Sequence, residues 1–281
     1  MEISVIQSSC RLCSPVLHFK LCLNSLSYTK TIRLHRSPLS ITTPSFRRTT
    51  GLRCSVEDEF PGVDTKTMVL NPSLSVKNKA VQIASDLKGT SIFLVGMNGT
   101  MKTYIGKVLA DALRYCFFDS DSLVGQASAV ASEFDIKSLR ERDEEGFRVS
   151  ETEVLRQLSS MGRLLVCTGD QAVWNSTNLS FLRDGISIWI DVPIEILVQE
   201  RIQGRSESFT EVSAELIEIY EKMRDGYATA DAIISLQKVA SQFGYNDTDS
   251  VTVEEMALQT LTKLENLTRV KKLMEAAARP F

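Results

Sequence analysis

The stretch SIFLVGMNGTMKT, residues 91–103, joins a short continuous apolar run to a turn bounded by two glycines and to the start of a helical pattern. An apolar run of this length is typical of a strand buried on both faces in a parallel sheet. A glycine turn between such a strand and a helix is where backbone amides can surround phosphate groups. The stretch therefore predicts a phosphate-binding loop, with a plain glycine turn as the alternative.

Four residues of this loop have the types that phosphate chemistry requires. Gly96 and Gly99 would let the backbone approach a nucleotide closely. Lys102 would meet the phosphates and Thr103 would hold Mg²⁺. The position before the lysine favours glycine, because a side chain there would crowd the phosphates, but it is Met101 in this chain. We therefore expect ATP and Mg²⁺ not to be required.

Strand-like runs alternate with helical patterns through most of the chain. Strands are expected at residues 91–95, 115–118, 163–168, 187–191 and 232–236, and helices at residues 76–87, 102–113, 122–160, from 193 onward, 211–224 and 253–264. Such alternation is typical of βαβ units, which place helices on both faces of a parallel sheet. The pattern predicts a single α/β domain at residues 76–266, with a five-stranded parallel sheet.

The chain before this domain differs from it in composition. Its first 55 residues hold eight basic residues, one acid, 16 serines and threonines and both histidines of the protein. An acid-poor, hydroxyl-rich and arginine-bearing segment is typical of an organelle transit peptide, and the hydroxyl excess favours the chloroplast. We interpret residues 1–54 as a chloroplast transit peptide, the alternative being a disordered basic tail. Residues 55–75, an acidic stretch that contains two prolines, are interpreted as a linker.

Without residues 1–54 the balance of charge becomes clearly negative. The remaining 227 residues have 24 basic and 34 acidic side chains, a balance of −10, and no histidine. The negative charge argues against a nucleic-acid partner, and the missing histidine excludes histidine-based triads and metal sites. Apolar runs fall short of the ~20 residues that would cross a bilayer. Cys116 and Cys167 are expected to be buried thiols.

Asp119 and Asp121 follow the second expected strand, where ligands of an open α/β sheet gather. Acids two residues apart on an extended segment face the same way, so the pair could serve a metal ion and a substrate hydroxyl. The alternative is that Asp121 caps the following helix.

Taken in order, these motifs resemble the shikimate kinase family, small P-loop NTPases of the nucleoside-monophosphate-kinase type with a three-layer fold. The resemblance rests on the loop, on Asp119-Ser120-Asp121 and on four further motifs. These are EGFRVSE at 145–151, Thr168-Gly169, IWIDVP at 188–193 and Arg201-Ile202. The transit-like segment is similar to that of the plastid enzymes of plants.

The resemblance implies a role for each matching residue. Asp119 would lie near the Mg²⁺ ion with Thr103. Asp121 and Arg148 would hold the hydroxyls and carboxylate of shikimate, with Glu151 steadying the arginine, since a guanidinium binds a carboxylate through two parallel hydrogen bonds. Arg201 would lie against adenine, and Gly169 against the shikimate ring.

Four departures from the family pattern affect different parts of that site. Met101 replaces the loop glycine, and Gly169-Asp170-Gln171 replaces three glycines. The lid at residues 204–208 keeps only one arginine, and Arg224 is one residue too close to Tyr227, which turns it by about 100° on a helix. Asp119, Asp121, Arg148 and Arg224 are therefore interpreted as vestigial, with no catalytic residue assigned.

The chain thus resembles the plant shikimate kinase-like group, considered to have lost kinase activity and to serve chloroplast development. The expected partner is a plastid protein or small ligand that the sequence does not name. The alternatives are an active small-molecule kinase, acting on shikimate or a related hydroxylated acid, and a module that binds nucleotide without transfer. Residues 267–281 are interpreted as a solvated tail, the alternative being a basic end that docks a partner.

Overall fold

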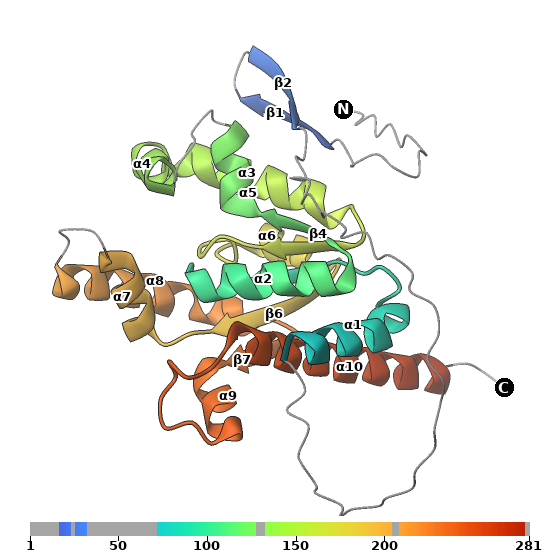
Figure 1. The fold of residues 1–281 in the computed structure, drawn as a ribbon. Coiled ribbons are helices and arrows are strands. Elements are labelled where there is room, and N and C mark those ends of the chain that lie inside the picture. The colour runs from blue at the N-terminus through green and yellow to red at the C-terminus, as the bar shows by residue number, and fades with distance from the viewer. Residues whose placement is uncertain (1–16, 24–25, 33–71, 128–132, 204–207, 279–281) are drawn as a thin grey trace, which may run out of the picture. The chain divides into compact units, whose positions relative to one another are not determined.

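The computed structural model describes residues 17–23, 26–32, 72–127, 133–203 and 208–278 (Figure 1). The chain forms two compact units, Met1–Val69 and Leu70–Phe281. In the first, β1 (Leu17–Leu23) and β2 (Leu26–Ile32) pair antiparallel. Most of the predicted transit peptide and residues 55–71 of the predicted linker lie outside the described residues, as do lid residues 204–207.

The second unit is built on a five-stranded sheet. Its strands are β3 (Ile92–Val95), β4 (Cys116–Asp119), β5 (Leu164–Cys167), β6 (Ile186–Asp191) and β7 (Ala232–Ser235). They pair in parallel in the order β4-β5-β3-β6-β7, with the fully buried β3 at the centre. This topology confirms the predicted α/β fold.

Helices cover both faces of this sheet. One layer consists of α1 (Pro72–Leu87), α2 (Thr100–Leu113) and α10 (Val253–Ala277), which pack on one another. The chain moves outward from β3 to β4 through α2 and returns to β5, so right-handed crossovers place the intervening helices on the opposite face. Those helices are α3 (Ser120–Ala127), α4 (Glu133–Arg142) and α5 (Glu144–Ser159), with α6 (Ser176–Leu182) packed against α5.

The remaining helices flank the far half of the sheet. They are α7 (Ile194–Ile202), α8 (Phe209–Tyr227) and α9 (Leu236–Phe243). The helices α7 and α8 pack against each other (Figure 1). Since α7 follows β6 directly, it begins at the same edge of the sheet as the glycine loop after β3.

Several element boundaries differ from the sequence predictions. The single helix expected at residues 122–160 is three helices. The last begins at Glu144 and is capped by Asp143, whose side chain accepts a hydrogen bond from the Gly146 amide at 2.9 Å. The short helices α6 and α9 were not predicted. The first helix begins at Pro72, inside the expected linker, and α10 continues to Ala277, inside the expected tail.

The core is apolar, as the strand patterns predict. Ile92, Phe93 and Leu94 are fully buried, and so is Cys167 at the end of β5. Burial raises the pKa of the Cys167 thiol to about 12. Cys116 is a free thiol of intermediate burial. Within the described ranges, no helix is long and apolar enough to cross a membrane.

Candidate functional site

The loop between β3 and α2, residues 96–103 and here called the phosphate loop, has the geometry that its glycines suggest. Gly96 has a φ of +128°, and a Cβ atom there would lie 2.5 Å from the carbonyl oxygen of Ile190 on β6. Only glycine adopts this backbone conformation readily at such close approach. The sheet and the loop therefore fix each other's position.

The lysine of the loop is turned inward. Lys102 is only 3% exposed, and its Nζ donates to the carbonyl oxygens of Gly96 and Thr168, both at 2.7 Å, and to Asn98 Oδ1 at 2.9 Å. An ammonium has three protons, so the donor capacity of Lys102 is filled by the protein itself. Burial lowers the pKa of this ammonium, although the carboxylates around it oppose the shift.

The amino end of α2 carries a carboxylate from another helix. Glu200 of α7 accepts a hydrogen bond from the Thr100 amide at 2.9 Å and a second from the Thr100 hydroxyl. Met101 lies in this first turn and is partly buried. Thr103 Oγ1 lies 3.4 Å from the carbonyl oxygen of Gly99, to which it donates.

The two aspartates after β4 do not lie on one extended segment, which was the basis for predicting that they face the same way. The helix α3 begins at Ser120, so Asp119 ends the strand while Asp121 lies in a helical turn. Asp119 accepts a hydrogen bond from the Ser122 amide at 2.8 Å, a capping role that the sequence analysis had offered as the alternative for Asp121. The described residues contain no group of three or more His, Cys, Asp or Glu side chains arranged to hold a metal ion.

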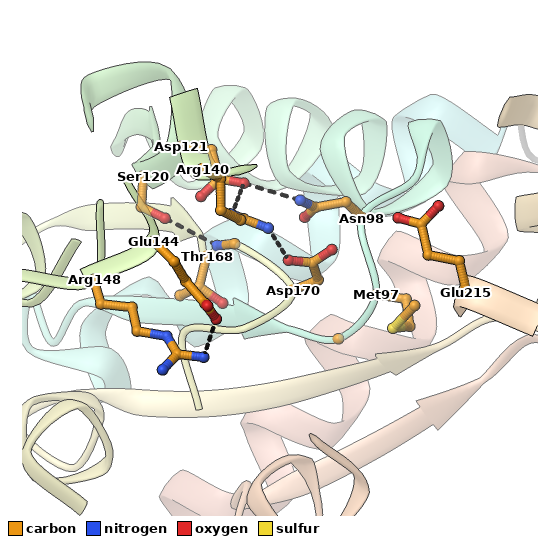
Figure 2. Close-up of polar contacts among 12 residues, drawn as sticks. Met97, Asn98, Ser120, Asp121, Arg140, Glu144, Arg148, Thr168, Asp170 and Glu215 are labelled. Carbon is orange, nitrogen blue, oxygen red and sulfur yellow. Dashed lines mark hydrogen bonds and ion pairs between the residues drawn. The ribbon is translucent and has the colours of Figure 1, made fainter. Parts of the chain in front are cut away.

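Asp121 instead belongs to an ion-pair network centred on Arg140 of α4 (Figure 2). Arg140 lies 3.2 Å from Asp121 and 2.7 Å from Asp170, the residue that replaces a family glycine. Asp121 also accepts a hydrogen bond from Asn98 Nδ2 at 2.9 Å, which joins the network to the phosphate loop. Burial would lower the pKa of Arg140, but Asp170 and Asp121 outweigh it and the pKa is raised.

A third carboxylate, Glu151, completes what we call the carboxylate cluster: Asp121, Glu151 and Asp170 around Arg140. A Cβ atom at Gly169 would lie 2.3 Å from Asp121 Oδ1 and 2.8 Å from Glu151 Oε1, so these two oxygens converge on one point. Neither oxygen has a hydrogen-bond partner. Burial first, and the neighbouring negative charges next, raise the pKa of Glu151 to about 8. Burial raises that of Asp121 to about 6.

Arg148, the expected carboxylate-binding arginine, is held on the outer side of the cluster. It forms an ion pair with Glu144, one turn earlier in α5 (Figure 2). Its guanidinium lies 3.9 Å from the ring centroid of Trp174. The resemblance had assigned the steadying role to Glu151, whereas Glu144 forms this ion pair. Pairing with Glu144 uses N–H donors by which a guanidinium binds an anion, and stacking on the indole of Trp174 fixes the plane of the group.

The other predicted site residues lie apart from this cluster. Arg201 of α7 forms an ion pair with Glu215 of α8 at 3.3 Å. Arg224 is exposed on α8, whereas Tyr227 is fully buried and donates a hydrogen bond to the carbonyl oxygen of Asp170. The sequence analysis gave no role to Asn98, Arg140, Glu144, Trp174 or Glu200. Only their place in a folded site distinguishes them from ordinary surface residues.

The order of these elements, a phosphate loop after the central strand and acids after the neighbouring strand, matches one known family. The family profile for shikimate kinase matches residues 98–265. The chain belongs to the shikimate kinase family. Among its relatives, "Probable inactive shikimate kinase like 1, chloroplastic" of Arabidopsis thaliana is 50% identical over 232 residues, which is 81% of each chain. "Shikimate kinase 3, chloroplastic" of Oryza sativa is 35% identical and covers 82% of this chain and 84% of its own.

Solved structures of shikimate kinases agree with this membership. The enzyme from Acinetobacter baumannii in complex with shikimate has a TM-score of 0.54 at 25% identity, covering 66% of this chain and 97% of that one. The enzyme from Bacteroides thetaiotaomicron gives a TM-score of 0.52 at 23% identity over 63% of this chain and 98% of that one, a likeness of fold alone.

Proposed function

We propose that this chain is a catalytically silent shikimate kinase-like protein of the chloroplast stroma, with a non-catalytic role in chloroplast development. The observation that carries the proposal is the Asp170–Arg140–Asp121 network. Asp170 brings a carboxylate to the substrate side, and Arg140 and Asn98 hold Asp121. A substrate carboxylate would meet the carboxylates of Asp121 and Asp170, and like charges repel strongly in a partly dry pocket.

Two further features support the loss of transfer. Phosphoryl transfer depends on positioning and charge neutralisation, and in a working loop the lysine and helix amides supply both. Here the ammonium of Lys102 is engaged with protein oxygens, and Met101 stands beside it in place of glycine. We therefore propose that neither ATP nor Mg²⁺ is required for the role of this protein.

The place of action is proposed from the chain itself and from its relatives. The acid-poor, hydroxyl-rich segment of residues 1–54 is typical of a plastid transit peptide, and the plant relatives quoted above are named chloroplastic. The acidic balance of residues 55–281 opposes nucleic acid as a partner. A plastid protein or a small ligand is the proposed partner.

A rescue experiment separates a non-catalytic role from an enzymatic one. A plant line that lacks this protein is complemented either with the full chain or with Thr103→Ala. That substitution removes the hydroxyl a metal-dependent kinase needs, at the cost of one weak hydrogen bond. We expect both chains to restore plastid development equally. A line rescued by the unaltered chain but not by Thr103→Ala would support the active kinase instead.

Nucleotide binding without transfer is tested separately. A non-hydrolysable ATP analogue is titrated while thermal unfolding of the full chain is followed. A ligand present at 100 times its dissociation constant adds about 2.7 kcal/mol to stability, and we expect no such gain. A clear gain would favour the nucleotide-binding module.

A further inference from the structure

Glu200 contacts the phosphate loop where a nucleotide phosphate would bind. One carboxylate oxygen accepts the Thr100 amide hydrogen at 2.9 Å, and the other accepts the Thr100 hydroxyl hydrogen. Thr100 is the first residue of the 14-residue helix α2, so its amide is among those without a partner inside the helix. Both oxygens of the Glu200 carboxylate therefore accept hydrogen bonds from the first residue of α2.

The charge of this contact matches that of a phosphate. The amino end of a helix carries a partial positive charge and attracts anions, whether phosphates or carboxylates. The neighbouring Arg201 forms an ion pair with Glu215 of α8, so its charge is balanced by that carboxylate. Glu200 is thus positioned as the anion that the end of α2 attracts.

The backbone packing brings α7 directly onto the loop. A Cβ atom at Gly99 would lie 2.6 Å from Leu197 Cδ2 and 3.2 Å from Glu200 Oε2. Because Gly99 has no side chain, another group can approach the loop closely. In an open loop that group would be a phosphate, and here it is α7. Lys102, three residues further on, is correspondingly turned to the Gly96 and Thr168 carbonyls.

We propose that Glu200 is an internal ligand of the phosphate loop: its carboxylate occupies the amino end of α2 and excludes external phosphates. This inference deepens the proposed function, on which it rests, by naming a contact that keeps nucleotide out in addition to Met101. It makes the occlusion reversible, because displacing one side chain of α7 would free the loop.

The experiment measures binding of inorganic tripolyphosphate and of a non-hydrolysable ATP analogue by titration calorimetry, using the full chain. Glu200→Gln removes the charge and keeps the size of the side chain. Glu200→Ala removes the whole contact, and Thr100→Val removes the hydroxyl hydrogen bond while keeping the amide one, so the test does not depend on one variant folding. Glu195→Gln is the matched control, since Glu195 is an exposed acid on the same helix.

We expect Glu200→Gln to tighten binding of both probes about tenfold over the unaltered chain, the scale of one charge at a helix end. Glu195→Gln should change binding less than about twofold, as expected for an exposed charge that solvent and salt screen. Equal gains in both variants would show a general charge effect and overturn the inference. The inference would also be overturned if Met101→Gly bound the probes more tightly and the Glu200 and Thr100 variants did not. It would be overturned as well if none of these variants bound the probes more tightly.

These outcomes are distinct from those that test the proposed function. A gain in binding by Glu200→Gln without phosphorylation of shikimate supports both proposals. Shikimate phosphorylation by the unaltered chain would overturn the proposed function, whatever the Glu200 variants do. If Glu200→Gln does not bind either probe more tightly and the unaltered chain does not phosphorylate shikimate, the inference about Glu200 is overturned and the proposed function is not.

Discussion

The phosphate loop and the carboxylate cluster are joined through Asn98 in one site, yet they depart from the family pattern in different ways. The loop keeps Gly96, Gly99, Lys102 and Thr103, and its lysine and helix end are occupied by groups of the protein. The cluster contains an additional charged residue, Asp170, and both Asp121 and Asp170 form ion pairs with Arg140. On the proposal above, the contact of Glu200 with the loop would be reversed by displacing one side chain, whereas Asp170 is a substitution in the sequence.

The largest expected effect tests whether the cluster depends on Arg140. Arg140→Met leaves Asp121 and Asp170, both largely buried, without their shared cation. Removing one partner of a buried ion pair typically costs 3–5 kcal/mol, so we expect a loss of about 3 kcal/mol in the free energy of unfolding. Urea denaturation measures it.

The control for this substitution is Arg156→Met. Arg156 pairs with Glu153 on the exposed side of α5, and such surface pairs contribute less than about 1 kcal/mol. Equal losses of unfolding free energy in the two variants would mean that the network around Arg140 contributes no more to stability than an exposed ion pair.

The loop side is tested through its backbone. Gly96→Ala combines a positive φ with a Cβ atom 2.5 Å from the Ile190 carbonyl oxygen, and we expect a loss of about 2 kcal/mol. Gly244→Ala is the matched control, because Gly244 also has a positive φ, +74°, but open space around it. Its loss should be about 1 kcal/mol, the cost of strain alone. Indistinguishable losses in denaturation would show that the loop is not fixed against β6.

The third prediction concerns pH and distinguishes the cluster from the loop. Glu151 keeps its proton up to a pKa of about 8 in the folded protein, against 4.5 for an ordinary glutamate. The folded state therefore binds more protons than the unfolded chain between these values. The stability that Glu151 contributes is complete below pH 4.5 and is lost as pH rises through 8.

Unfolding free energies measured between pH 6 and 8 should fall by about 1.4 kcal/mol per pH unit from this group. Glu151→Gln, which cannot ionise, should remove that slope. Asp121, Asp170, Arg140 and Arg148 face Glu151 and are kept in both chains, so the difference between the two chains reports the titration of Glu151 and its interaction with these groups. Parallel pH profiles for the two chains would contradict the raised pKa.

The smallest expected effect is the contribution of Glu200 to stability. Glu200→Ala removes hydrogen bonds at a partly exposed helix end, and we expect a loss of no more than about 1 kcal/mol. The same denaturation assay measures it. A loss as large as that of Arg140→Met would mean that Glu200 is structural and that the loop is not reversibly occluded.

The sequence predicted the sheet because each strand is a short apolar run next to a glycine or acid, and those patterns depend on local residues alone. The loop, Asp121 and Gly169 were likewise identifiable, since their types follow a fixed order after strands. The family membership and the fold are confirmed by the comparisons.

The partners of these residues could not be predicted. Arg140 is one of several charges in a polar stretch, and only the break between α4 and α5 at Asp143 directs it to Asp121 and Asp170. Glu200 and Thr100 are 100 residues apart and meet because β3 and β6 are neighbours in the sheet. Asp170 was identifiable as a departure from the glycines of the family, but its pairing with Arg140 depends on the same tertiary contacts.

The most direct test of the account is phosphorylation of shikimate by the full chain with ATP and Mg²⁺. A variant with Met101→Gly, Asp170→Gly and Gln171→Gly together, which restores the glycines of the family, is measured beside it. We predict no turnover by the unaltered chain and tighter nucleotide binding by the restored variant. Turnover by the unaltered chain at a usual kinase rate of ~1–100 s⁻¹ would contradict the central claim that this site is silent.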